Sequence, residues 1–201
     1  MKSNRAESFT LRRREVAKRI SSVRDDLLIV TGLGSSNWDF TSTGDRDETF
    51  PLWGAMGGAV PLALGLALAQ PERRVLVVTG DGEMMMGVGS LATVALQAPK
   101  NLGIAVFDNE RFGETGMQVT PTAFDADLAA IAAGCGIKTT GTVRDEAELE
   151  VAIPKLLDQP GPAFFVIKVR AEPLKFVLPP KDGVHLKNRF RTAVLGDAGV
   201  L

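Results

Sequence analysis

The sequence predicts an α/β domain in which a doubly wound, mostly parallel sheet carries helices on both faces. Short apolar runs that are typical of buried strands alternate with longer stretches that are typical of helices. Two of these runs, residues 75–79 and 102–107, end in polar tips, Gly80-Asp81-Gly82 and Asp108-Asn109. Because ligands bind at the carboxyl edge of such a sheet, both tips are expected at one binding edge.

The other elements follow the same alternation along the chain. Residues 8–24 are expected to form an amphipathic helix whose basic run, 12–14, lies on a solvated face. An irregular arm is expected from residue 173, and it holds the only histidine, His185, as an exposed or interface residue. The remaining predictions are strands over 27–30, 137–141 and 163–169, and helices from the turn near 58 through 69, over 83–97, 125–133 and 145–157.

Composition limits the possible functions. The chain has 201 residues, 45% of them hydrophobic, and a net charge of −1, which is typical of one globular domain. Such a balance gives no reason to expect nucleic acid or a charged membrane as partner. No export signal or membrane span is indicated, and the single cysteine, Cys135, excludes an internal disulfide. These observations favour a cytoplasmic protein.

The polar tips suit a divalent cation that bridges to a diphosphate. Asp81 offers a carboxylate oxygen and Asn109 an amide oxygen, and hard cations such as Mg²⁺ prefer oxygen ligands. Gly80 and Gly82 allow a sharp turn and a close approach of the backbone to phosphate. The helix that begins near Glu83 directs free N–H groups at an anion, so Glu83 is a candidate cofactor contact.

At this point the sequence resembles the thiamine diphosphate (ThDP) enzymes. Their motif is Gly-Asp-Gly, about two dozen further residues, and then Asn; here residues 83–108, which are 26 residues, separate Gly82 from Asn109. The resemblance implies that ThDP and Mg²⁺ are the cofactors, and that Asp81, Asn109 and the backbone carbonyl of Arg111 bind the metal. Asp108 departs from the family, in which many members have a first Asn.

A second motif lies upstream of the aspartate. ThDP enzymes carry a glycine-rich turn about 25 residues before it, and Met56 precedes Asp81 by 25 residues. In the family a bulky apolar side chain at this place holds the cofactor in a bent conformation, which implies that Met56 and backbone groups near Gly54 contact the aminopyrimidine ring. Without this spacing, Met56 would be interpreted as a core residue.

The loop after the first strand, 31–37, begins like a Gly-x-Gly-x-x-Gly dinucleotide motif. Its third position is Asn37 and no helix is expected to follow, so an NAD site is not favoured. In the resemblance this loop lies near the diphosphate, which makes Gly34 and Ser35 candidate phosphate contacts. The polar segment 37–49 could either close over substrate or be a solvated connection.

The stretch after Asn109 indicates which of the ThDP enzymes the sequence resembles most. Residues 110–122 are most similar to the corresponding stretch of sulfopyruvate and phosphonopyruvate decarboxylases, in which a Tyr- or Phe-Gly and a Thr-Gly follow the metal-binding Asn. Residues 112–120, with Phe112 and Gly113 at their start, would then cover the diphosphate and reach towards the substrate. The Arg111 side chain is a candidate partner for the anionic group of such substrates.

The resemblance covers residues 26–170 and only one of the two domain types that ThDP enzymes need. Residues 1–25 are expected to be a helical segment of the same domain, and 171–201 an arm that lies at an interface. The implied assembly is a heteromer whose partner subunit binds the pyrimidine ring and supplies an activating glutamate. This chain would then be inert alone, and the complex would convert a small 2-oxo acid to CO2 and an aldehyde.

Two other functions stay open from the sequence. One is a ThDP-dependent carboligase or acyl transferase subunit, similar to acetolactate synthase. The other is a non-catalytic phosphate-binding subunit that regulates a partner.

Overall fold

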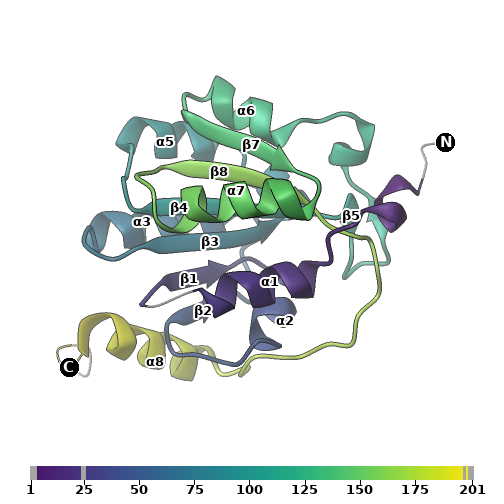
Figure 1. The fold of residues 1–201 in the computed structure, drawn as a ribbon. Helices are drawn as coiled ribbons and strands as arrows, with labels where there is room; N and C mark the ends of the chain where they lie inside the picture. Colours follow the sequence, from purple (N-terminus) through teal and green to yellow (C-terminus); the bar gives the residue numbers. More distant parts are fainter. Residues whose placement is uncertain (1–3, 24–25, 197, 199–201) are drawn as a thin grey trace.

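A computed structural model describes residues 4–23, 26–196 and 198 of the chain. Within this part, six strands form one sheet in the order β2-β1-β3-β4-β8-β7, and all neighbouring pairs are parallel. The predicted doubly wound α/β fold is therefore confirmed (Figure 1). The strands are β1 (Leu28–Thr31), β2 (Thr49–Pro51), β3 (Val75–Gly80), β4 (Leu102–Asp108), β7 (Thr139–Val143) and β8 (Ala163–Lys168).

Helices cover both faces of the sheet, because alternate side chains of each strand point to opposite sides. Leu28 and Val30 join one apolar core with α3, α5 and α6, whereas Ile29 joins the other with α1 and α7 (Figure 1). The helices are α1 (Arg13–Ser22), α2 (Ser35–Thr41), α3 (Ala59–Ala69), α4 (Asp81–Met86), α5 (Ser90–Gln97), α6 (Leu128–Gly134), α7 (Glu146–Leu157) and α8 (Gly183–Leu195), with 3-10 turns η1 (Arg5–Ser8) and η2 (Pro121–Phe124). No helix in the described ranges is long and apolar enough to cross a membrane.

The strand order reverses next to β1. The chain goes from β1 outward to β2 and then returns to β3 on the other side of β1, so the switch point lies between β1 and β3. Gly80 pairs with Phe107 in the register of β3 and β4. The two polar tips therefore follow paired positions at one edge of the sheet, where ligands bind in this architecture.

The loop after β1 runs into a helix, α2, which the sequence did not predict. Its polar residues are held by side-chain contacts: Asn37 Oδ1 accepts a hydrogen bond from Thr31 Oγ1 (2.6 Å), and Asn37 Nδ2 donates to the carbonyl of Leu52 (3.2 Å). Residues 36–40 are buried. The segment 37–49 was expected to be irregular, either as a loop over the substrate or as a solvated connection; its first part, 37–41, is helical instead, and the irregular connection begins only at residue 42.

The prediction of a solvated basic run is also wrong. Arg13 is buried, and its Nε lies 2.8 Å from Oδ2 of Asp39 in α2. Arg14 contacts the same carboxylate at 3.2 Å. Of the three arginines only Arg12 is largely exposed, in an ion pair with Glu172. Both buried contacts depend on tertiary neighbours, which the local sequence does not reveal.

The C-terminal arm lies against its own chain. It is irregular through residue 182, as predicted, but then forms the helix α8, which packs on β2 through the rings of Phe50 and Phe190, 5.3 Å apart. On the way it passes the two tryptophans: Trp53 Nε1 donates to the carbonyl of Pro180 (3.0 Å), and the Trp38 ring lies 5.5 Å from that of Trp53. The predicted role of the arm at an interface stays a prediction.

Two smaller differences concern the segments around the site. The helix predicted over 83–97 is divided into α4 and α5 by the segment 87–89, which contains two glycines. The segment after Asn109 forms a short antiparallel hairpin, β5 (Arg111–Phe112) and β6 (Gln118–Val119), which the sequence did not predict.

Candidate functional site

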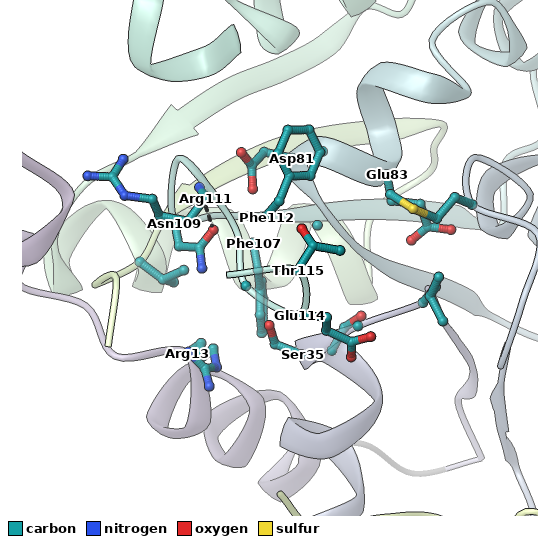
Figure 2. A pocket seen from close by; sticks show the side chains of 18 residues that line it. Arg13, Ser35, Asp81, Glu83, Phe107, Asn109, Arg111, Phe112, Glu114 and Thr115 are labelled. Carbon is teal, nitrogen blue, oxygen red and sulfur yellow. Dashed lines mark hydrogen bonds between the residues drawn. The ribbon is translucent and has the colours of Figure 1, made fainter. Parts of the chain in front are cut away.

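A pocket opens at the carboxyl edge of the sheet, between the loops that follow β1, β3 and β4 (Figure 2). All predicted site residues except Gly54 line it, namely Gly34, Ser35, Met56, Gly80, Asp81, Gly82, Glu83, Asn109, Arg111, Phe112 and Gly113. Gly54 is exposed in the turn that carries Met56. Segments far apart in the sequence thus meet in one cavity.

Asp81 is the first residue of α4 and is almost fully buried. The hydroxyls of Thr120 and Thr122 both donate to its Oδ2, so Oδ1 accepts neither of them. Burial, and next the charge of Asp108, raise the pKa of Asp81 to about 7. Since a nearby cation would favour the charged form, this carboxylate is suited to bind one.

Asn109 lies in a tight turn at the end of β4. Its Oδ1 accepts a hydrogen bond from the backbone N–H of Arg111 (3.0 Å), and Asp108 Oδ1 accepts one from the N–H of Glu110 (3.0 Å). Glu110 adopts a φ of 58°, which is uncommon for residues other than glycine. These two side chains fix the reversal of the chain that starts the hairpin.

The guanidinium of Arg111 is already engaged on the side of the N-terminal segment. It donates to the carbonyl of Glu110 (2.9 Å) and to Oδ1 of Asn4 (3.3 Å). The predicted metal ligand is the main-chain carbonyl of Arg111, which these side-chain contacts do not involve. Its side chain is a weaker candidate for binding a substrate anion than the sequence indicated.

Asp108, the departure from the family motif, has a compensating cation. Lys168 Nζ lies 2.6 Å from Asp108 and 3.2 Å from Glu110, and Arg5 lies 2.8 Å from Glu110. Although burial acts to raise the pKa of Glu110, the hydrogen bond from Arg5 and the charge of Lys168 lower it. These ion pairs therefore stabilise the two residues that flank Asn109 in the chain.

Glycines bring the backbone close to the cavity. Gly34 has a φ of 108°, and a Cβ atom on Gly82 would lie only 2.3 Å from the Phe112 ring. Phe112 therefore packs directly on the Gly-Asp-Gly turn.

The pocket offers carboxylate, amide and main-chain oxygens. This donor set fits a small hard cation and a diphosphate. The described residues contain no cluster of three or more His, Cys, Asp or Glu side chains for a metal, so any such ion needs these other donors.

Comparison with known families identifies this domain. Residues 37–167 match the model described as thiamine pyrophosphate enzyme, C-terminal TPP binding domain, where TPP is another name for ThDP. The chain belongs to this family.

Individual relatives cover this TPP-binding domain to different extents. It is 36% identical over 186 residues to the sulfopyruvate decarboxylase subunit beta of Methanothermobacter thermautotrophicus, a match that covers 92% of this chain and 97% of the relative. It is 37% identical over 170 residues to a phosphonopyruvate decarboxylase of Streptomyces viridochromogenes, but spans only 42% of that protein and 84% of itself. Among solved structures, a benzoylformate decarboxylase from Polynucleobacter necessarius shares the fold, with a TM-score of 0.65 at 22% identity over 82% of this chain and 33% of that one.

Several lining residues of the TPP-binding domain had no signal in the sequence. Arg13 is one of them and reaches the cavity from α1, whereas Glu114, which reaches it from the hairpin, belongs to the stretch 112–120 that was expected there (Figure 2). Burial raises the pKa of Glu114, while a hydrogen bond from Trp38 acts in the opposite direction. The other unpredicted lining residues are Leu33, Ser36, Phe107 and Val169. Thr115 and Thr120 belong to the stretch 112–120 that was expected to cover the diphosphate, and Thr122 ends the segment that resembles the decarboxylases.

Glu83 differs most from its predicted environment. It is only 3% exposed, and its Oε2 accepts a hydrogen bond from Thr79 Oγ1. Burial raises the pKa of Glu83, and the Thr79 hydroxyl and the backbone N–H groups of Ala59, Gly57 and Leu33 oppose this effect. The Glu83 side chain therefore lies between the turn that contains Leu33 and the turn that contains Gly57.

Proposed function

We propose that this chain is the metal- and diphosphate-binding subunit of a split ThDP-dependent 2-oxo acid decarboxylase. The main support is its correspondence to almost the whole length of a sulfopyruvate decarboxylase β subunit, which by name is one subunit of a larger enzyme. The larger phosphonopyruvate decarboxylase contains the same segment within one longer chain. The substrate class, a small 2-oxo acid, rests on these names and on the resemblance.

The pocket residues divide into three groups by what they would hold. Oδ1 of Asp81, the amide oxygen of Asn109 and the carbonyl of Arg111 would bind Mg²⁺. The backbone at Gly34, Ser35, Gly80 and Gly82 would approach the diphosphate, with Phe112 and Gly113 above it, while Met56 and the turn at Gly54 would contact the pyrimidine ring. When bound, ThDP accepts the electron pair released as CO2 leaves the 2-oxo acid.

The chain contributes binding and orientation to this reaction. Thr120 and Thr122 hold Asp81 in place, and the ion pairs of Asp108 and Glu110 hold the turn at Asn109. The cavity encloses about 130 Å³, which is small for a cofactor site. This size agrees with a site that a pyrimidine-binding partner subunit completes, and that partner would supply the activating glutamate in a heteromer. A cytoplasmic location is proposed on the lone cysteine, which suits a reducing compartment.

Co-purification of the full chain from its native source tests this proposal directly. Mass spectrometry should identify a second subunit and bound ThDP, and the complex should release CO2 from 2-oxo acids without an aldehyde acceptor. Dependence on such an acceptor would indicate a carboligase instead. Failure of both the chain and the complex to bind ThDP with Mg²⁺ in calorimetry would contradict the proposal and favour a regulatory phosphate-binding subunit.

A further inference from the structure

Two glycine-rich turns contribute residues to the lining of the pocket. One follows β1 and contains Gly32 and Gly34, and the other precedes α3 and contains Met56 and Gly57. The first turn stays attached to the sheet only where it begins, because the N–H of Gly32 donates to the carbonyl of Val78 in β3 (2.8 Å), so the positions of the other residues depend on further contacts. Glu83, in the first turn of α4, lies between them (Figure 2).

Glu83 contacts the first turn at very short range. A Cβ atom on Gly32 would lie 1.7 Å from Oε2 of Glu83, so the carboxylate occupies the space that any other residue at position 32 would need. The Thr79 hydroxyl, at the end of β3, donates to the same oxygen. The carboxylate is thus held between Gly32, which follows β1, and Thr79, near the end of β3.

The second turn is attached to α4 at two points. The N–H groups of Gly57 and Ala59 face the Glu83 carboxylate, more loosely than Thr79 does, and Oε1 has no hydrogen-bond partner of normal geometry. At the other end of α4, a Cβ on Gly87 would lie 2.3 Å from the carbonyl oxygen of Gly57. The position of Met56 is therefore set by α4.

We propose that Glu83 is a positioning residue: its carboxylate fixes both glycine-rich turns on α4 and so aligns the diphosphate contacts near Gly34 with Met56. What the turns bind rests on the proposed function, but the anchoring itself does not. If Glu83 only filled space, glutamine could replace it. An anchor that accepts from both a hydroxyl and N–H groups could not be replaced in this way, because a glutamine amide has only one acceptor oxygen.

The test is a double-mutant cycle between positions 32 and 83 in the full chain, with its partner present. Gly32→Ala alone should push the carboxylate away and weaken ThDP binding about tenfold, as loss of a supporting contact commonly does. In the Glu83→Ala background the three atoms nearest to the added methyl group are gone, so Gly32→Ala should change the affinity less than about twofold. Gly65→Ala, on the exposed side of α3 with no atom within 4 Å of the new Cβ, is the matched control.

Glu83→Gln keeps the size of the side chain and supplies the second measurement. It should weaken ThDP binding nearly as much as Glu83→Ala, and hydrogen exchange in the free chain should speed up in peptides covering 31–34 and 55–59 more than elsewhere. Wild-type affinity and exchange in Glu83→Gln, or equal effects of Gly32→Ala in both backgrounds, would overturn the proposal. If the wild type binds no ThDP, the proposed function fails, yet the exchange measurement still decides the anchoring.

Discussion

Asp81, the proposed metal ligand, is buried at a cost to stability. Its pKa is raised to about 7 by burial and by Asp108, whereas an aspartate in an unfolded chain titrates near pH 4. Between these values the folded state holds a proton that the unfolded state has lost. The metal-free protein must therefore lose stability as the pH rises through this window.

Asp81→Asn should remove this penalty. The metal-free variant should be as stable as the wild type near pH 4 and more stable at pH 7.5, by about 4 kcal/mol in free energy of unfolding. Thermal unfolding in chelator at several pH values measures the difference. A constant difference between the two proteins across this range would show that Asp81 does not titrate there.

The hydroxyls of Thr120 and Thr122 orient the Asp81 carboxylate through its Oδ2 atom. Replacing both by Val removes two hydroxyl donors to Oδ2 with little change in volume, so Asp81 should lose its fixed rotamer. Changes to residues that support a metal ligand weaken metal binding by roughly 10–100-fold, and the same loss is expected here for Mg²⁺ in the presence of ThDP. Calorimetry on the complex gives the affinity. Thr93→Val, on the exposed face of α5, should leave it unchanged.

At the scale of elements, the β5–β6 hairpin depends on one glycine of the preceding motif. Phe112 packs against the Cα of Gly82, and Gly82→Ala would bring the new methyl group 2.3 Å from its ring. The ring and the hairpin must shift, which should weaken ThDP binding about tenfold while the sheet stays intact. Titration of ThDP into the complex and circular dichroism test the two parts. Gly89→Ala, where a Cβ meets no atom within 4 Å, should bind normally.

The elements also show which patterns the sequence reveals. The strands β3 and β4 and the polar tips behind them were predictable, because continuous apolar runs interrupted by Gly-Asp-Gly and Asp-Asn have few other interpretations. The helix α2 was not, since its polar residues are buried through side-chain hydrogen bonds from Thr31 and to Leu52. Arg13 was missed for the same reason: its partner Asp39 belongs to another helix.

In the proposed function the whole molecule contributes half of a site, and a metal ion would connect the two halves. Chelation of the assembled complex should release ThDP, because the diphosphate would lose the cation that joins it to Asp81 and Asn109. Asp81→Ala should have the same effect without a chelator and leave the fold intact. Size-exclusion chromatography followed by mass spectrometry of the bound fraction gives the result. Retention of ThDP in both experiments would refute the metal assignment.

The tryptophan pair gives this protein an intrinsic optical probe. The chain has two tryptophans and no tyrosine, and Trp38 hydrogen-bonds Glu114, which lines the cavity, while its ring lies 5.5 Å from that of Trp53. Nearly all of the protein's ultraviolet fluorescence therefore comes from this pair of neighbouring tryptophans, next to a residue that lines the pocket. Arrival of a small molecule or of another subunit there can be followed in real time by a change in fluorescence, with no dye or label attached.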